Sequence, residues 1–156
     1  MARVHTFVRQ QRIDCPRDEV FRFFENPLNL ESITPGLLHF RTLTPPPIVM
    51  RVGTLIDYRL RLYGVPVRWR TRIEAFDPPT RFVDVQLRGP YRVWRHLHEF
   101  SDVDGATLMT DRVEYELPLG PLGELAGALF VRRSLSRIFD FRRDAVDQLF
   151  HVKRFA

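Results

Sequence analysis

The sequence predicts an α+β fold in which one long helix covers the apolar face of an antiparallel sheet. Three observations predict this class. Between residues 54 and 119, apolar and polar side chains alternate with a period of two, which is typical of half-buried strands. Short turn signals separate these stretches, and strands joined by tight turns are antiparallel. From residue 121 to residue 150, apolar side chains instead recur at the spacing of a helix that buries one side.

The N-terminal part of the chain predicts one strand followed by two short helices. Residues 3–13 mix Val, Phe and Ile with polar residues, which indicates a strand. Residues 14–27 follow as a helix, because Pro16 suits a first helical turn and acidic residues follow it. A second short helix is expected at 28–33, before a Thr-Pro-Gly stop.

Six further strands are expected in series, at 37–43, 54–63, 65–76, 81–87, 91–100 and 106–119. Tyr63 and Gly64 predict a two-residue hairpin turn, and residues 77–80 and 102–105 hold the Asp, Pro and Gly residues typical of turns. Together with the first strand, these segments predict a sheet of seven antiparallel strands.

The C-terminal helix is expected to be amphipathic over residues 121–150. Its apolar positions recur three and four residues apart, at Leu122, Leu125, Leu129, Leu135, Ile138, Phe139, Ala145, Val146 and Leu149. Arginines fill much of the remaining surface. Such a stripe needs a surface to bury against, and the apolar face of the sheet supplies one.

Composition bounds the class of protein. The 156 residues are 44% hydrophobic and carry a net charge of +5, which indicates a single globular domain over residues 1–156. Cys15 is the single cysteine of the sequence, so neither an intramolecular disulfide nor a cysteine metal cluster is expected. No apolar run approaches the roughly 20 residues that cross a bilayer, and the N-terminus lacks a signal-like apolar core. We therefore expect a cytoplasmic protein.

The hairpin of residues 54–76 carries arginine at alternate positions. A two-residue turn at 63–64 places Tyr58 opposite Trp69 on the inner face. The same pairing places Asp57 opposite Arg70 on the outer face. The outer face gathers the arginines Arg59, Arg68, Arg70 and Arg72. We interpret it as solvated, with weak contact with an anionic membrane surface as the functional alternative. Nucleic acid is not an expected partner, because the aromatic side chains that would stack on bases point to the opposite face.

The strand of residues 91–100 places polar side chains among apolar ones on its inner face. Trp94, His96 and His98 share that face, and the turn at 102–105 places His96 opposite Asp111, give or take one residue. An imidazole beside a carboxylate can act as an acid or base, or can orient a ligand. Two histidines alone do not make a metal site, and without a clear third ligand no metal and no cofactor are expected.

Asp84 and Gln86 leave two alternatives open. A bulge near Gly89 and Pro90 would decide which face they occupy. In one register they join His96 in a cavity, and in the other they neutralise arginines on the outer face.

Two stretches resemble a known superfamily. Residues 15–35, CPRDEVFRFFENPLNLESITP, and residues 111–135, DRVEYELPLGPLGELAGALFVRRSL, resemble START-like proteins of the SRPBCC or helix-grip superfamily, which includes polyketide cyclase/dehydrase and coenzyme Q-binding-like proteins. The resemblance covers about residues 3–150. It implies a curved seven-stranded sheet wrapped around the C-terminal helix, with two short helices after the first strand and a ligand cavity between sheet and helix.

The expected function follows from that cavity. Members of the superfamily bind lipid-, quinone- or polyketide-like molecules, and a minority are cyclases or dehydratases, so the fold alone does not decide between them. We expect a binding protein or carrier for a small hydrophobic molecule. The alternative is a cyclase or dehydratase in which His96, His98 and Asp111 act as acid–base groups. The expected ligand-binding residues are Tyr58, Trp69, Trp94, His96, His98, Met109, Asp111 and Tyr115.

Overall fold

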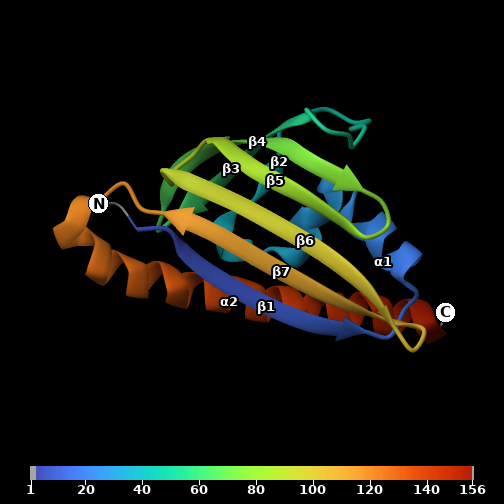
Figure 1. Ribbon diagram of the computed structural model, residues 1–156. Coiled ribbons are helices and arrows are strands. Elements are labelled where there is room, and N and C mark those ends of the chain that lie inside the picture. The colour runs from blue at the N-terminus through green and yellow to red at the C-terminus, as the bar shows by residue number, and fades with distance from the viewer. Residues whose placement is uncertain (1–2, 156) are drawn as a thin grey trace.

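The computed structural model describes residues 3–155. It describes the side chains of these residues except those of Leu122 and of residues 152–155. Seven antiparallel strands form one curved sheet in the order β1-β7-β6-β5-β4-β3-β2 (Figure 1). The strands are β1 (His5–Ile13), β2 (Arg41–Thr42), β3 (Leu55–Leu62), β4 (Val65–Asp77), β5 (Arg81–Arg88), β6 (Val93–Val103) and β7 (Ala106–Glu116). The predicted α+β class and the number of strands are confirmed.

Three short helical segments follow the first strand. They are the α-helix α1 (Arg17–Phe24) and the 3₁₀-helices η1 (Pro27–Ile33) and η2 (Gly36–Leu38). The predicted strand at 37–43 is therefore wrong over its first half. Pro35 precedes the η2 turn, and His39 ends it in the left-handed conformation with φ of 46°. A residue at positive φ breaks an extended strand, so pairing begins at Arg41.

The arginine-bearing hairpin has the predicted register. Tyr58 pairs with Trp69, and Asp57 pairs with Arg70. The two turn residues have φ of 53° and 78°, which is the primed turn geometry that matches the twist of a two-residue hairpin. Further along β4, Glu74 has no partner on β5, because the register shifts between Ile73 and Ala75. This bulge bends the strand as the sheet curves toward the long helix.

The hairpin of β6 and β7 differs from the predicted register by two residues. Its turn residues are Asp104 and Gly105, so Val103 pairs with Ala106. As a result, Asp111 lies opposite His98 and not His96. Moving a hairpin turn by one residue shifts every pair by two, and a shift of two keeps each side chain on its face. The predicted inner face is therefore preserved although the predicted partner is wrong.

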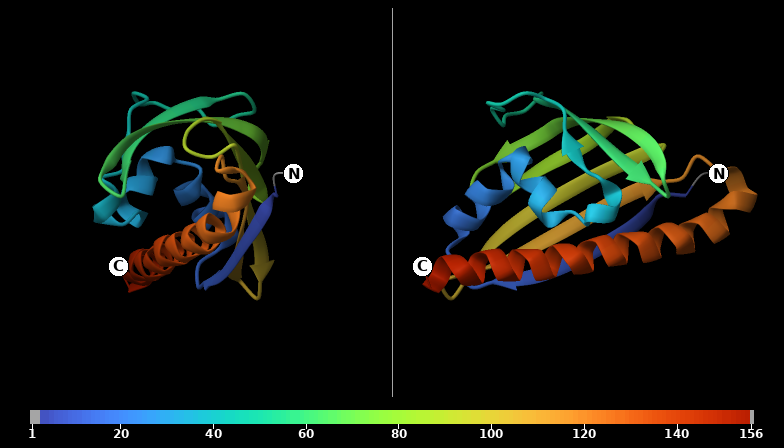
Figure 2. Two further views of the ribbon diagram at one scale, coloured as in Figure 1. Left: turned by 90° about the vertical axis from the view of Figure 1, so that its left-hand side faces the viewer. Right: turned by 180° about the vertical axis from the view of Figure 1, so that it is seen from behind.

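The long helix α2 (Gly120–Phe155) crosses the concave side of the sheet and extends past it at its N-terminal end (Figure 2). Leu135, Phe139 and Val146 are buried, as the apolar stripe predicts. Leu125, Leu129 and Leu149 are exposed, with fractions of 86%, 55% and 36%. The sequence predicts one continuous buried stripe. The first turns of α2, which carry Leu125 and Leu129, instead extend past the sheet, where these two side chains have no surface to pack against. Leu122, another predicted member of the stripe, lies outside the described side chains.

An aromatic core joins the short helix to the sheet and to the end of α2. Phe21 on α1 contacts Phe76, Phe82 and Phe100, with ring centroids 5.2 to 6.0 Å apart. The same cluster includes Val146 and Phe150 from α2. Segments more than a hundred residues apart thus meet in one core.

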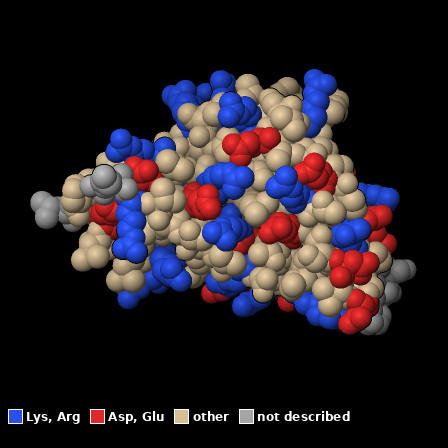
Figure 3. Space-filling view, in the orientation of Figure 1, with Lys and Arg blue, Asp and Glu red and all other residues tan. Residues whose placement is uncertain are grey.

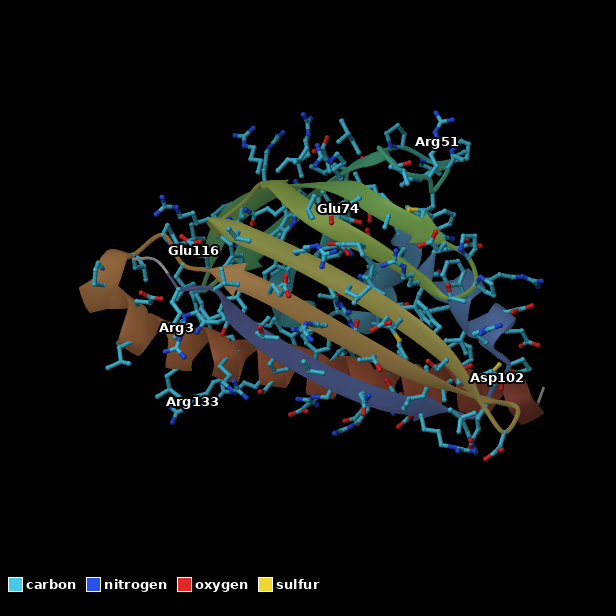
Figure 4. All side chains as sticks on the ribbon, in the orientation of Figure 1. Arg3, Arg51, Glu74, Asp102, Glu116 and Arg133 are labelled. Carbon is cyan, nitrogen blue, oxygen red and sulfur yellow. The ribbon has the colours of Figure 1, made fainter. Side chains whose placement is uncertain are left out.

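The outer face of the sheet is charged and mixed in sign (Figure 3). Arg70 donates to Asp57 at 2.8 Å, and Arg95 donates to Glu74 at 2.9 Å. Figure 4 shows Glu74 on this outer side. The four arginines named for membrane contact, Arg59, Arg68, Arg70 and Arg72, are all exposed here. A solvent-exposed strand face accounts for the arginines at alternate positions. Weak contact of this face with an anionic membrane surface stays a prediction.

Candidate functional site

A cavity of about 180 Å³ lies between the sheet, the η1–η2 segment and α2. Side chains on the inner faces of β3, β4, β5 and β6 line it, because alternate residues of each strand face the helix. Leu135 and Ile138 of α2 line the side opposite the sheet, and Leu30 of η1 and Leu38 of η2 also line the cavity. Most of the lining is apolar, as in pockets that bind small hydrophobic molecules.

Aromatic rings form one wall of the cavity. Trp69 and Trp94 meet edge to face with centroids 5.1 Å apart, and Tyr91 lies 4.7 Å from Trp94. On the neighbouring strand, Tyr58 packs against Phe40. Burial raises the pKa of Tyr58, so its hydroxyl stays protonated and can donate a hydrogen bond.

Four charged or titratable side chains form a buried polar cluster, which we define as Asp84, His96, His98 and Asp111. His96 Nε2 lies 2.7 Å from Asp111 Oδ1, and His98 Nε2 lies 2.7 Å from Asp84 Oδ2. His98 Nδ1 is 3.3 Å from the same Asp111 oxygen, an ion-pair distance without hydrogen-bond alignment. The two imidazole rings stack with centroids 3.7 Å apart. Three adjacent strands thus converge on one network.

The surroundings shift the pKa values of the two histidines in opposite directions. Burial alone would lower the pKa of His98, but its contacts with Asp111 and Asp84 outweigh burial and raise that pKa above its ordinary value. Burial and the neighbouring His98 charge lower the pKa of His96. Burial opposes ionisation of the two carboxyls, yet hydrogen bonds from the histidines keep both of their pKa values low. These directions favour two carboxylates, a protonated His98 and a neutral His96 in the polar cluster.

Neutral His96 has one defined tautomer. Asp111 is ionised and can only accept, so His96 donates its Nε2 proton to it. The lone pair then resides on His96 Nδ1, and within the described residues no hydrogen bond reaches that atom. A carboxylate that orients an imidazole with a free basic nitrogen is an arrangement suited to proton transfer or to accepting a hydrogen bond.

We expect nitrogen NMR shifts to show His98 doubly protonated and His96 neutral near neutral pH. As the pH rises, His96 should lose its proton below the ordinary value of 6.5 and His98 above it, because their pKa values shift in opposite directions. Changing Asp84 to Asn should bring the pKa of His98 down while His96 stays neutral. Titration of both rings together near 6.5 would contradict this assignment.

The structure brings together five of the eight expected ligand-binding residues. Those that line the cavity are Tyr58, Trp69, Trp94, His96 and His98. Asp111 stands behind them and bonds the histidines. Met109 packs in the aromatic core beside Phe100, and Tyr115 packs with Val113 and Phe139, so neither lines the cavity.

Asp84 and Gln86, whose face was undecided, both turn inward but take different roles. Asp84 lines the cavity and bonds His98. Gln86 instead closes the connection between β5 and β6, because its side chain bonds the backbone N–H and C=O of Tyr91. The connection is thereby tied to β5 by an uncharged side chain.

Arg142 is a cavity residue that the sequence interpretation missed. It lines the cavity from α2, with its guanidinium 4.9 Å from the centre of the Phe139 ring. A signal for it was present, because Arg142 follows Ile138 and Phe139 at helical spacing and precedes Ala145 and Val146. One arginine in an otherwise apolar stripe marks a charge turned toward the core.

Asp84, His96 and His98 also place three potential metal-ligand atoms within 4.8 Å of one another. Asp84 is the third ligand whose absence was the reason for expecting no metal. A divalent cation would have to replace the proton shared between His98 and Asp84, because both atoms are already engaged at 2.7 Å. Among the described residues, these three are the ones that could hold such an ion.

Comparisons with solved structures show which fold this is. The aromatase/cyclase Zhui from Streptomyces sp. R1128 superposes with a TM-score of 0.75 at 13% identity, covering 96% of this chain and 94% of that one. The protein has the START-like helix-grip fold. A Chromobacterium violaceum protein matches at 0.72 and 14%, covering 93% and 96% of the two chains, and Ara h 8.0201 matches at 0.67 and 15%, covering 96% and 99%.

At these identities the likeness establishes the helix-grip fold alone. No protein-family model and no curated protein matches the sequence. None of the described helices is long and apolar enough to cross a membrane. Function therefore has to be argued from the cavity of this chain.

Proposed function

We propose that this helix-grip protein binds a small hydrophobic molecule that carries a polar group at one end. The observation that supports the proposal is the cavity itself, whose lining is mostly apolar but includes Asp84, His96 and His98 of the buried polar cluster. Apolar walls supply the driving force, whereas a few placed polar groups orient the ligand. Titratable groups with shifted pKa values in a cavity are candidates for such a site.

The size of the cavity bounds the ligand. At about 180 Å³ it is slightly larger than the roughly 150 Å³ cavity that accommodates a benzene ring. One or two fused rings, or a short branched chain, fit this volume. A large lipid would require the helix to move away from the sheet. We therefore favour a compact aromatic or polyketide-like ligand.

A second candidate function is a cyclase or dehydratase reaction on such a ligand. The observation that favours it is the hydrogen bond between Asp111 and His96, which leaves a basic nitrogen in the cavity. His96 could take a proton from a bound carbonyl compound, while the His98 imidazolium stabilises charge nearby. One solved structure of the same fold is named an aromatase/cyclase.

Changing His96 to Ala should weaken binding of 2-naphthalenemethanol by about 1–3 kcal/mol, because its hydroxyl loses a buried partner. Naphthalene should be almost indifferent to the same change. Changing Trp94 to Ala should weaken both, since it removes apolar contact area. Quenching of tryptophan fluorescence measures the affinities, and His151→Ala, at an exposed position, is the control.

Two outcomes separate the candidates. If the probe is recovered unchanged and loses affinity in the His96→Ala variant, the carrier function is supported. If the variant binds as the wild type does but no longer converts a carbonyl compound that the wild type converts, the enzyme function replaces it. Equal losses for naphthalene and its alcohol would contradict a polar role for His96.

A further inference from the structure

Arg142 has a buried donor that no protein atom satisfies. Its Nε is inaccessible to solvent and has no hydrogen-bond partner. Within the part of the chain that the structure describes, the guanidinium makes no ion pair, although arginines elsewhere in the fold pair with carboxylates. The guanidinium lies over the Phe139 ring, which offers no hydrogen-bonding oxygen. Arg142 thus lines the cavity with an Nε donor that has no protein acceptor.

Such a group is costly to keep. Buried polar groups are nearly always hydrogen-bonded, and a buried charge without a partner destabilises the folded state. Burial lowers the pKa of Arg142, and the carboxylates of Asp111 and Asp84 counter this effect in part. Arginine nevertheless stays protonated in proteins. A position that only had to pack against Phe139 would be served better by an apolar side chain, as at the stripe neighbours Ile138, Ala145 and Val146.

The charges around the cavity balance before any ligand enters. Asp84 on β5 and Asp111 on β7 each contribute one negative charge, and His98 on β6 contributes one positive charge. His96 is neutral, as is Tyr58 on β3. Arg142 on α2 brings the total to zero. Both carboxylates already accept hydrogen bonds from histidines. His98 Nδ1 and Arg142 Nε both lack a hydrogen-bond partner, but His98 still lies 3.3 Å from Asp111, so among the described residues Arg142 is the cation of this set without a paired carboxylate.

We propose that Arg142 binds a carboxylate of the ligand, and that the ligand class is a compact hydrophobic acid. This inference rests on the proposed binding function and specifies its polar end. A guanidinium and a carboxylate match as planar two-pronged partners, and the interaction is strong where water is excluded. A monoanion suits the site better than a dianion because two fixed carboxylates lie nearby. A dianionic phosphate would meet one unused cation and two carboxylates.

The test compares 2-naphthoate with 2-naphthalenemethanol, which share the ring system and differ in charge. Calorimetry on the wild type should show that the acid binds at least about tenfold more tightly. Arg142→Met should lower the affinity for the acid by about tenfold or more and change that for the alcohol by less than about threefold. Arg142→Lys should retain part of the preference. Arg133→Met is the matched control, because Arg133 is exposed on α2 and points away from the sheet (Figure 4).

Thermal unfolding supplies a second measurement. Arg142→Met should be about as stable as the wild type, because the lost attraction to the Asp84 and Asp111 carboxylates is offset by the removal of a charged group whose Nε is buried without a partner. Marked destabilisation of both Arg142→Met and Arg142→Lys would show a structural role and overturn the inference. So would equal affinities for the two probes that neither variant changes, while the proposed binding function would stand. Failure of the wild type to bind either probe would instead overturn the binding function itself.

Discussion

Replacing Asp111 by Ala is expected to destabilise the protein by about 3–5 kcal/mol, the cost of breaking a buried charge pair from one side. Asp111 is buried and accepts from His96 at 2.7 Å while its charge lies 3.3 Å from His98. Without it, the Nε2 proton of His96 has no acceptor and the His98 imidazolium keeps one carboxylate. Some hydrogen-bond donors of the polar cluster would then lack acceptors in a low-dielectric interior, where unmade hydrogen bonds are most costly.

Chemical denaturation near neutral pH measures this loss. Asp57→Ala is the control, because it also removes an Asp from an ion pair, but one between half-exposed groups, and should cost at most about 1 kcal/mol. Asp111→Asn keeps an acceptor oxygen and should fall between the two. Similar losses for Asp111→Ala and Asp57→Ala would mean that the cluster is hydrated and not buried.

The difference between wild type and Asp111→Ala should depend on pH in a defined direction. The pKa of Asp111 is lowered in the folded state, so its stabilisation is present above the ordinary aspartate value and is lost as the pH falls through the folded value. The pKa of His98 is raised, so its contribution is complete below the ordinary value of 6.5 and is lost as the pH rises through the raised value. The difference should therefore be largest between these two limits.

Replacing Phe21 by Ala should also cost about 3–5 kcal/mol, for a different reason. Phe21 is 2% exposed and packs against three phenylalanines contributed by β4, β5 and β6. Truncation removes the apolar area of the ring and leaves a cavity whose walls belong to different elements and cannot collapse together. Because this one side chain contacts rings from three strands, we expect the loss at the upper part of the range.

Urea unfolding with the matched control Leu125→Ala tests this expectation. Leu125 is 86% exposed, so its truncation should change the free energy of unfolding by no more than about 0.5 kcal/mol. Phe21→Leu should cost less than Phe21→Ala, since it refills part of the space. A loss below about 1 kcal/mol for Phe21→Ala would mean that α1 is not docked on the sheet.

The hairpins show how far the sequence alone reaches. The alternation in residues 54–76 determines which side chains face inward, and the Tyr63-Gly64 turn determines their partners, so the pairing of Tyr58 with Trp69 was predictable. Between β6 and β7 the Asp-Val-Asp-Gly stretch allows the turn at more than one position. The inner face of His96 and His98 was predictable there, but the partner of each histidine was not.

Local pattern therefore determined the class of fold, the succession of strands along the chain and the inner face that carries Trp94, His96 and His98. Tertiary structure alone decided that Asp84 joins the polar cluster, that Asp111 serves both histidines, and that Met109 and Tyr115 pack into the core. The physical reason is that periodicity specifies a direction for each side chain, whereas depth and partners depend on bulges, sheet curvature and the path of α2. For Arg142, the sequence and the tertiary structure each supply part of the answer. Its position in the helical stripe is visible in the sequence. That its Nε has no partner depends on where α2 crosses the cavity, which offers no protein acceptor there.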